Sequence, residues 1–489
     1  MSRQDNEDMH QRIIPKVPSF MRLKNMSDDY DPKVMSLGPY HHGKKELKFV
    51  EDFKPKALQM FIEGSNKDYN FFLEKIFEEI ERAKSCYLEE FTSQYNDDYF
   101  ARMMLLDACI VLMDIEIVTE FSKSWEVKYS FTKEHLGVAG YCAAAHDLYL
   151  LENQVPFWIL KLLFNLRYVK DDISLTYDHQ FENIVQYYCS YLCFGDHRLY
   201  KEYWETEPPH LFEVFRRELI IFGDKNKDDY LMQQRRHHHH HQPPASSLSG
   251  SVSDQWKKKV QNMKKITNSH INSWCFGRYC CIRKKGHHKP KTPRCVFRSV
   301  IELKSKGIHF RPSRVNSFNC GAKFHSHCYY AELWLPPWYV SSVTKTALQN
   351  MIAYEICPNS VNHGDISVTS YISFMKALIT SPQDVKELRE KKIIINYLGS
   401  DEEVVQVFRS VNTYGTRGQS SFDEINFKIK EHFHSRVRTW FAELVNAYFT
   451  SPWSLITLIA ATFLLFLAMV QAFYASPLHN LHPSKKFRY

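Results

Sequence analysis

The sequence of 489 residues lacks several common signatures of enzymes. It contains no G-x-S-x-G nucleophile elbow, no G-x-x-x-x-G-K-[ST] phosphate-binding loop, no H-E-x-x-H zinc motif and no set of protein-kinase motifs. It also shows no secretory signal, since its first twelve residues, MSRQDNEDMHQR, are polar and charged. These absences weaken the case for an enzyme and predict a cytosolic main body.

Cysteine is present, but its spacing forms no small disulfide framework. Several of the 12 cysteines, including Cys109 and Cys142, lie in apolar runs. Buried thiols of this kind behave as small hydrophobic side chains. The pattern therefore predicts reduced cysteines in a reducing compartment and excludes the class of small disulfide-rich secreted proteins.

Charge is missing from residues 444–484, which contain no Asp, Glu, Lys or Arg. Within them, residues 453–474 form an apolar run that would span about 33 Å as a helix, enough to cross a bilayer core of about 30 Å. Trp453 and Tyr474 stand at its two ends, where amphipathic rings favour the membrane interfaces. The run predicts one transmembrane helix and a lipid bilayer as partner.

The charges flanking this run leave its orientation open. Lys485, Lys486 and Arg488 follow it, and the positive-inside rule would place this short tail in the cytosol. The long N-terminal body, however, has no signal that would carry it across a membrane. We therefore favour insertion of the tail alone, with the body in the cytosol at the plasma membrane or an endomembrane.

Positive charge is concentrated in one segment. The net charge is +8, and residues 255–298 hold 13 Lys or Arg and no acidic residue, which leaves −5 for the rest. The segment predicts a solvated loop first, contact with anionic lipid headgroups second, and nucleic-acid binding as the least favoured interpretation. The candidate basic patch comprises Lys257, Lys258, Lys259, Lys264, Lys265, Arg283, Lys284, Lys285, Lys289 and Lys291.

The patterning predicts a mainly α protein with a helical N-terminal body, an α+β C-terminal half with a small β element, and one C-terminal transmembrane helix. Its length predicts two or three packed units. A run of His, Pro and Ser predicts a disordered linker. The expected parts are a polar tail (1–10), a helical half (11–230), the linker with the basic insert (231–293), a second half (294–448), the span (453–474) and a short basic tail (475–489).

Local patterns predict individual elements. Apolar residues at three- to four-residue spacing predict one amphipathic helix over residues 69–80, and residues 101–114 are apolar enough for a central core helix. Pro156 predicts that two helices meet near Gln154. Further predictions are short strands within 317–337 and helices over 351–357, 371–379 and 402–411, the last one capped by Ser400 with Glu403.

Several motifs resemble those of a plant family called domain of unknown function 247. They are IPKVPSFMR (14–22), PKVMSLGPYHHGKKEL (32–47), MMLLDACIVL (103–112), DLYLLENQVPFWIL (147–160), RSVIELKSKGIHF (298–310) and MIAYEIC (351–357). The resemblance implies a plant protein, usually with one C-terminal span and without an established catalytic activity. Some grass members of that family are associated with pollen self-incompatibility recognition. The linker and the poly-His run (237–241) depart from the family pattern.

Candidate polar sites are better explained by structure than by chemistry. Cys320, His325, His327 and Cys328 do not converge if they lie on a strand, because alternate side chains face opposite ways. An upstream group matches no standard metal-site spacing: Cys275, Cys280, Cys281, His287, His288 and Cys295.

Two further polar positions fit structural roles. We interpret His41 and His42 as part of a turn packed by Tyr40. Asp107 lies in the predicted core helix and must be paired there. No catalytic, cofactor-binding or metal-binding residue is predicted.

These observations favour a membrane-anchored, non-enzymatic recognition, signalling or scaffold protein with an unknown protein partner. The alternative is a membrane-tethered enzyme with a site in the C-terminal half.

Overall fold

The computed structural model describes most of both halves of the chain. The described residues are 13–22, 29–168, 180–194, 206–221, 299–313, 315, 317–318, 321–327, 330–357, 365–415, 422–434 and 452–475. The chain divides into one unit made of Met1–Asp224 and Phe297–Tyr489, and a second made of Lys225–Val296. The predicted linker and basic patch fall in the second unit, outside the described residues.

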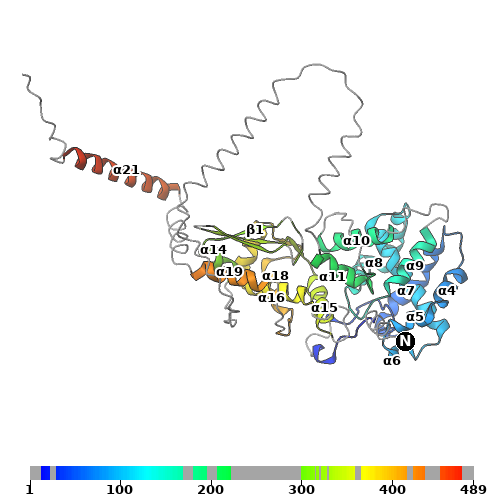
Figure 1. Ribbon diagram of the computed structural model, residues 1–489. Helices are drawn as coiled ribbons and strands as arrows, with labels where there is room; N and C mark the ends of the chain where they lie inside the picture. Colours follow the sequence, from blue (N-terminus) through cyan, green and yellow to red (C-terminus); the bar gives the residue numbers. More distant parts are fainter. Residues whose placement is uncertain are drawn as a thin grey trace, which may run out of the picture. The chain divides into compact units, whose positions relative to one another are not determined.

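The N-terminal half is built from helices, as predicted (Figure 1). They are η1 (Ser19–Met21), η3 (Lys45–Leu47), α2 (Lys48–Glu51), α3 (Lys54–Ile62), α4 (Tyr69–Phe77), α5 (Ile80–Ser85), α6 (Glu89–Thr92), α7 (Asp97–Thr119), α8 (Trp125–Asp147), α9 (Phe157–Tyr168), α10 (Gln180–Phe194) and α11 (Leu211–Ile221).

Helix α7 is the central helix of this half, which confirms the prediction for residues 101–114. Asn96 is its N-cap, and the Asn96 side chain accepts a hydrogen bond from the backbone N–H of Tyr99. Most of its side chains are buried, and α3, α4, α5, α8, α9 and α10 all contact it. A helix that is apolar on nearly every side must be surrounded by other elements, and α7 is.

The helix predicted over residues 69–80 is divided in two. Asp68 caps α4, which buries Phe72 and Ile76 and ends at Phe77. A turn follows, and α5 starts at Ile80 and packs on α7. The prediction of a single helix was wrong because the apolar spacing continues through the turn, while the backbone leaves helical geometry at Glu79. The turn lets Ile80 reach the core that α7 provides.

The C-terminal half mixes helices with short strands, again as predicted. Its helices are α14 (Val300–Ser305), α15 (Thr344–Ile356), α16 (Ser367–Leu378), α17 (Pro382–Glu390), α18 (Asp401–Ser410) and α19 (Phe422–His434). Its strands are β1 (Ile308–Pro312), β2 (Lys323–Ser326), β3 (Ala331–Leu335), β4 (Trp338–Val340) and β5 (Ile394–Asn396). Ser400 caps α18 by accepting a hydrogen bond from the N–H of Glu403.

The strands form two small sheets. In the first, the order is β1-β3-β2, with β1 parallel and β2 antiparallel to β3. In the second, β4 runs parallel to β5. Helix α14 packs on β1 and α19 on β2, and Figure 1 shows both helices on the same side of the first sheet. One face of that sheet is therefore covered by helices.

The two halves share one hydrophobic core, which runs from Ile14 to Ile429. Helix α10 contacts β4, and α11 contacts α16. Arg216 of α11, which is 2% exposed, pairs with Glu355 of α15 and with Asp365. The halves thus belong to one packed unit rather than to separate ones, because each covers apolar surface of the other.

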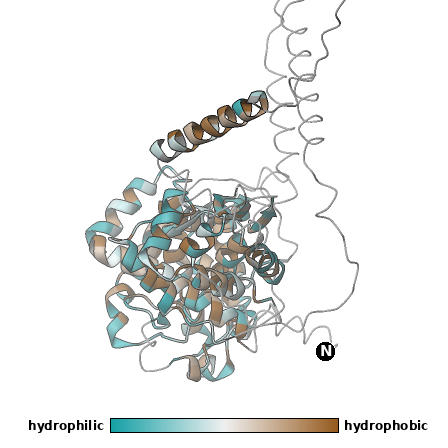
Figure 2. Ribbon diagram, turned by 90° about the vertical axis from the view of Figure 1, so that its left-hand side faces the viewer, coloured by the Kyte–Doolittle hydropathy of each residue, from teal (hydrophilic) through white to brown (hydrophobic). Residues whose placement is uncertain are grey.

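Helix α21 (Pro452–Ala475) is set apart by its length and apolar composition, and none of its described side chains belongs to the core. Figure 2 shows hydrophobic colour along most of its length. It contains one stretch, Ile456–Tyr474, long and apolar enough to cross a membrane.

Candidate functional site

The turn between α8 and α9 carries the most concentrated set of buried polar side chains among the described residues of the family motifs. Helix α8 ends at Asp147 and α9 begins at Phe157, which confirms that two helices meet near Gln154. Val155, the residue before Pro156, is disfavoured in helical conformation, so α9 does not extend back beyond this proline. Glu152, Asn153 and Gln154 are all buried. We call Asp147, Glu152, Asn153 and Gln154 the polar clamp.

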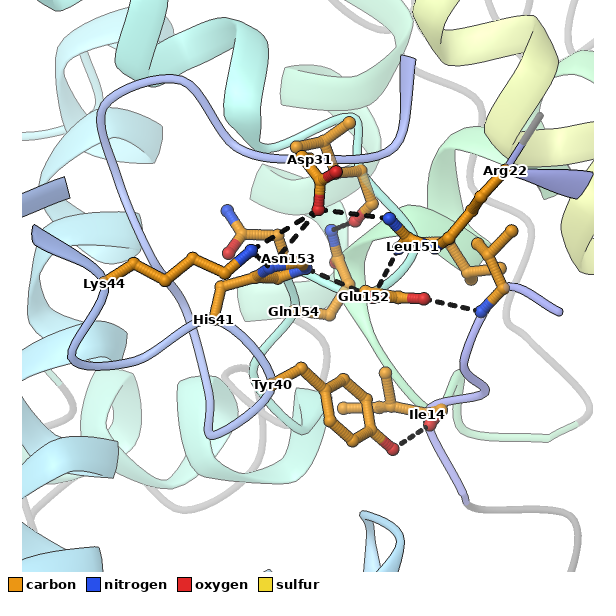
Figure 3. Close-up of polar contacts among 12 residues, drawn as sticks. Ile14, Arg22, Asp31, Tyr40, His41, Lys44, Leu151, Glu152, Asn153 and Gln154 are labelled. Carbon is orange, nitrogen blue, oxygen red and sulfur yellow. Dashed lines mark hydrogen bonds and ion pairs between the residues drawn. The ribbon is translucent and has the colours of Figure 1, made fainter. Parts of the chain in front are cut away.

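Glu152 lies at the centre of the polar clamp and is fully buried. Its Oε1 accepts a hydrogen bond from the backbone N–H of Val17 at 2.7 Å. Its Oε2 lies 2.7 Å from Nη2 of Arg22 and 3.2 Å from Nε2 of His41. Both carboxylate oxygens are therefore engaged by the N-terminal segment (Figure 3).

A second carboxylate extends this cluster toward solvent. Oδ1 of Asp31 lies 3.1 Å from Arg22, 3.7 Å from His41 and 3.5 Å from Lys44. Nζ of Lys44 also lies 2.9 Å from Nδ1 of His41. Figure 3 shows these side chains converging between the N-terminal loops and the turn that carries Glu152. Glu152 is buried at the inner end of the cluster, whereas the side chains of Asp31 and Lys44 are partly exposed to solvent.

Asn153 and Asp147 bind the backbone of the same N-terminal segment. Oδ1 of Asn153 accepts from the N–H of Leu37 at 2.7 Å, and its Nδ2 donates to the carbonyl of Met35 at 3.0 Å. The carboxylate of Asp147 accepts from the N–H groups of Lys33, Val34 and Met35. These bonds satisfy backbone groups in a segment without regular secondary structure.

The remaining contacts tie the turn to other parts of the body. Gln154 accepts from the N–H of Phe212 in α11 at 3.1 Å. Asn350 of α15 accepts from the N–H of Leu151 at 3.0 Å and donates to the carbonyl of Asp29 at 2.7 Å. The turn thus joins the N-terminal segment, α11 and α15, which are far apart in the sequence.

The two carboxylates and the arginine of this cluster are stabilised in their ionised forms. Burial by itself would raise the pKa of Glu152, but His41 and Arg22 outweigh it and lower the pKa below its usual value. Burial would likewise raise the pKa of Asp31, but the charges of Arg22 and Lys44 outweigh it and lower that pKa. The neighbouring carboxylates raise the pKa of Arg22. A general acid near neutral pH needs a raised carboxyl pKa, so this cluster is suited to holding the chain together rather than to proton transfer.

The two adjacent histidines have different surroundings. His41 is 3% exposed and faces Glu152, whereas Nε2 of His42 lies 2.8 Å from the hydroxyl of the exposed Tyr99. The hydroxyl of Tyr40 donates to the carbonyl of Ile14 at 2.7 Å. The predicted structural turn around Tyr40 is therefore present.

Asp107 is paired, as its position in a core helix requires. Its Oδ1 lies 2.6 Å from Nζ of Lys54, and its Oδ2 accepts from the N–H of Gly38 at 2.8 Å. Lys54 also donates to Glu51 and to the carbonyl of Ser36. Both members of the Lys54–Asp107 pair are 1% exposed. This buried pair fixes α3 and the SLGPY loop on α7.

The other candidates from the sequence are placed only in part. Trp453 and Tyr474 lie in α21 and are 77% and 69% exposed. His325 lies in β2 and His327 just after it, while Cys320, Cys328, the upstream Cys/His group and the poly-His run lie outside the described residues. Within the part of the chain that is described, no group of three or more potential ligands could hold a metal ion.

Sequence reasoning missed the clamp residues Glu152, Asn153 and Gln154. The available signal was three consecutive polar residues inside the apolar run DLYLLENQVPFWIL. Polar residues in such a run must be hydrogen-bonded when buried. Lys54 and Arg216 gave no comparable signal, because their flanking residues are mixed in polarity.

Fold and site together define a mainly α protein whose N-terminal segment is held by a buried polar clamp, with an apolar helix near its C-terminus. The chain belongs to the family domain of unknown function 247, described as plant protein of unknown function, whose model matches residues 14–467. The match includes the polar clamp and both halves of the body.

Two proteins of Arabidopsis thaliana are similar over most of their length. The UPF0481 protein At3g47200 is 25% identical over 483 residues, covering 94% of this chain and 85% of that protein. The putative UPF0481 protein At3g02645 is 21% identical over 490 residues, covering 91% of this chain and 87% of that protein. No solved structure matches the chain.

Proposed function

We propose that this chain is a single-pass membrane protein, anchored by α21, whose body is a non-enzymatic recognition or scaffold module. The body lies in the cytosol, at the plasma membrane or an endomembrane. The observation that carries the anchor is a long apolar helix in which no described side chain is buried.

The side chains of α21 give this argument its weight. Leu464, Leu465 and Phe466 are 64%, 66% and 58% exposed at the middle of the helix. Burying each one stabilises by about 1.5–3 kcal/mol, so leaving them in water is unfavourable. A helix of 24 residues is about 36 Å long, which matches a bilayer core with a modest tilt. The hydrocarbon core of a membrane would remove these apolar side chains from water.

Carbonate extraction of membranes from plant cells tests the anchor. We expect the full chain to remain in the pellet, and the double variant Leu464→Arg/Leu467→Arg to move to the supernatant. Two arginines at the helix centre oppose insertion by about 6 kcal/mol. The matched control Leu464→Met/Leu467→Met keeps the helix apolar and should stay in the pellet. Release of the wild-type chain by carbonate would overturn the anchor.

Protease digestion of sealed vesicles tests the orientation separately. With a cytosolic body, protease added outside microsomes should degrade the body, and a tag after Tyr489 should be protected. Protection of the body instead would reverse the orientation without affecting the anchor.

Recognition is supported by apolar side chains on the outer surface of α2 and α8. Phe49 is 52% exposed, and a Cβ added to Gly140 would lie 3.1 Å from its ring. Val138, two residues from Gly140, is 56% exposed. Phe49 and Val138 are therefore exposed apolar side chains on two elements that contact each other, and exposed apolar surface favours contact with a protein partner. By contrast, a cavity between α7 and α8 has a volume of about 20 Å³, room for one water molecule rather than a substrate.

Proximity labelling from the body in plant cells tests this surface. We expect Phe49→Lys/Val138→Lys to lose specific labelled proteins that the wild type retains. The control Ile301→Lys changes an apolar side chain that is 42% exposed on α14, and it should keep those proteins. If both variants label the same proteins as the wild type, the α2/α8 surface is not the recognition surface.

A further inference from the structure

Among the described residues, α14 and α19 pack on one face of the first sheet, and the side chains of the opposite face have an unusual composition. Alternate residues of its strands point away from the core, and they pair across the sheet in two rows. His309, Glu332 and His325 form one row, and Arg311, Trp334 and Lys323 form the other. We call these six residues the outer sheet face.

The outer sheet face carries more positive than negative charge. Glu332 is the one carboxylate among these six residues, and its Oε1 lies 3.2 Å from Nε of Arg311, whose side chain is 49% exposed. It also accepts from Nε1 of Trp334 at 3.3 Å. Lys323 adds a further positive charge at the opposite edge strand. Burial, followed by the positive charge of Arg311, lowers the pKa of His309, which is consistent with cationic surroundings.

Aromatic rings complete this surface. Trp334 is half-buried in the central strand, between Arg311 and Lys323 in register. Tyr330, directly before β3, is 40% exposed and stacks on His327 with ring centroids 4.5 Å apart. Trp and Tyr beside Lys and Arg are the side chains enriched where proteins meet the headgroup region of a bilayer.

The chain leaves the body for α21 beside this sheet. Near the end of α19, Phe324 of β2 contacts His432, and Nζ of Lys306 lies 5.9 Å from the Phe433 ring. Residues 435–451 then connect α19 to α21, which begins at Pro452. Even fully extended, this connection spans at most about 60 Å. If α21 crosses a bilayer, the sheet is therefore kept within reach of that bilayer.

We propose that the outer sheet face contacts an anionic membrane surface, with Arg311 and Lys323 at the headgroups and Trp334 and Tyr330 at the interface. The inference rests on the proposed anchor, because α21 supplies the high local concentration of lipid. It adds a folded lipid-contacting surface that is distinct from the basic segment 255–298. Attraction of this kind is electrostatic and weakens about fivefold for each basic side chain removed.

Lysine acylation of the full chain reconstituted in vesicles tests the proposal. We expect Lys323 to be labelled more slowly in vesicles of phosphatidylcholine with phosphatidylserine than in phosphatidylcholine alone. Protection should be lost on raising salt from 0.1 M to 1 M, since the Debye length falls from about 10 Å to about 3 Å. Lys133, exposed on α8, is the internal control and should be labelled equally in both vesicles.

A pair of variants assigns the effect to the sheet. Arg311→Gln should reduce the protection of Lys323 about fivefold. The control Arg82→Gln removes an arginine that is 41% exposed on α5, and it should leave the protection unchanged. Circular dichroism of each variant confirms that the fold is retained.

The outcomes separate the two proposals. If the chain does not stay with vesicles after carbonate treatment, the anchor is wrong. If it stays, and Lys323 is labelled equally with and without phosphatidylserine, the anchor stands and the sheet proposal is wrong. If single-stranded RNA protects Lys323 in phosphatidylcholine vesicles as strongly as phosphatidylserine does, the face is a nucleic-acid surface and the lipid assignment is overturned.

Discussion

The substitution Glu152→Gln removes one negative charge from the centre of the polar clamp while keeping nearly the same shape. The amide oxygen of Gln can still accept the hydrogen bond from Val17, so the backbone contact at 2.7 Å survives. Arg22 and His41 lose the carboxylate oxygen they share. The substitution therefore measures the charge of Glu152 rather than its packing.

The expected loss follows from these contacts. Breaking a buried ion pair destabilises by about 3–5 kcal/mol. Arg22 keeps Asp31 at 3.1 Å, and its side chain is 20% exposed, so solvent and Asp31 compensate in part. We therefore expect the free energy of unfolding to fall by about 2–3 kcal/mol.

Urea unfolding of residues 1–450 provides the assay, because none of the described side chains of α21 contributes to the core. Glu424→Gln is the matched control, since Glu424 pairs with Lys428 at 2.6 Å on an exposed surface of α19. Exposed pairs contribute little, so the control should unfold at the wild-type urea concentration.

The pH dependence adds a second check on the same residue. The pKa of Glu152 is lowered in the folded state, so as the pH falls the unfolded chain takes up this proton first. Its contribution is complete above about pH 5 and declines as the pH falls through the folded pKa. The stability gap between wild type and Glu152→Gln should narrow accordingly. If Glu152→Gln lowers the free energy of unfolding at pH 7 by no more than Glu424→Gln does, Glu152 is not a stabilising charge.

Other substitutions test separate contacts. Asp107→Asn should destabilise by about 3 kcal/mol in urea, and the double variant Asp107→Leu/Lys54→Met by less, because it leaves no buried charge unpaired. Burial and a nearby arginine lower the pKa of His210 to about 3, so the unfolded chain binds the proton first. The contribution of His210 to the free energy of unfolding should therefore fall by about 1.4 kcal/mol per pH unit as the pH drops below 6.5. A stability difference between wild type and His210→Asn that does not change with pH would contradict this. Gly38→Ala should destabilise the protein more than Gly43→Ala. Both glycines have a positive φ, which strains alanine equally, but only a Cβ at Gly38 would meet neighbouring atoms, 2.8 Å from the hydroxyl oxygen of Tyr87.

Local features of the fold could be predicted because their causes lie within a few residues of sequence. Residues 101–114 are apolar on nearly all sides, and that property alone requires a central helix such as α7. Pro156 disfavours helical conformation at the residue before it, whatever surrounds it, so α9 begins only after this proline. The serine hydroxyl of Ser400 reaches an N–H three residues on. The apolar run of α21 was equally visible in the sequence.

The division of residues 69–80 between α4 and α5 could not be predicted in this way. Apolar residues keep helical spacing through the turn, so the sequence pattern is the same for one helix as for two. The position of α7 decides where Ile80 must lie, and the backbone turns to place it there. Tertiary packing outweighs local periodicity at this point.

The sequence by itself determined that the chain is mainly α, that Asp107 needs a partner and that residues 453–474 form an apolar helix. Only the tertiary structure decided that this partner is Lys54, which is 53 residues away. It also decided that Glu152 holds Val17 across 135 residues and that Leu151 binds Asn350 across 199. The physical reason is range: periodicity and capping act within one or two turns of chain, whereas a buried polar group takes the partner that folding of the whole chain brings to it.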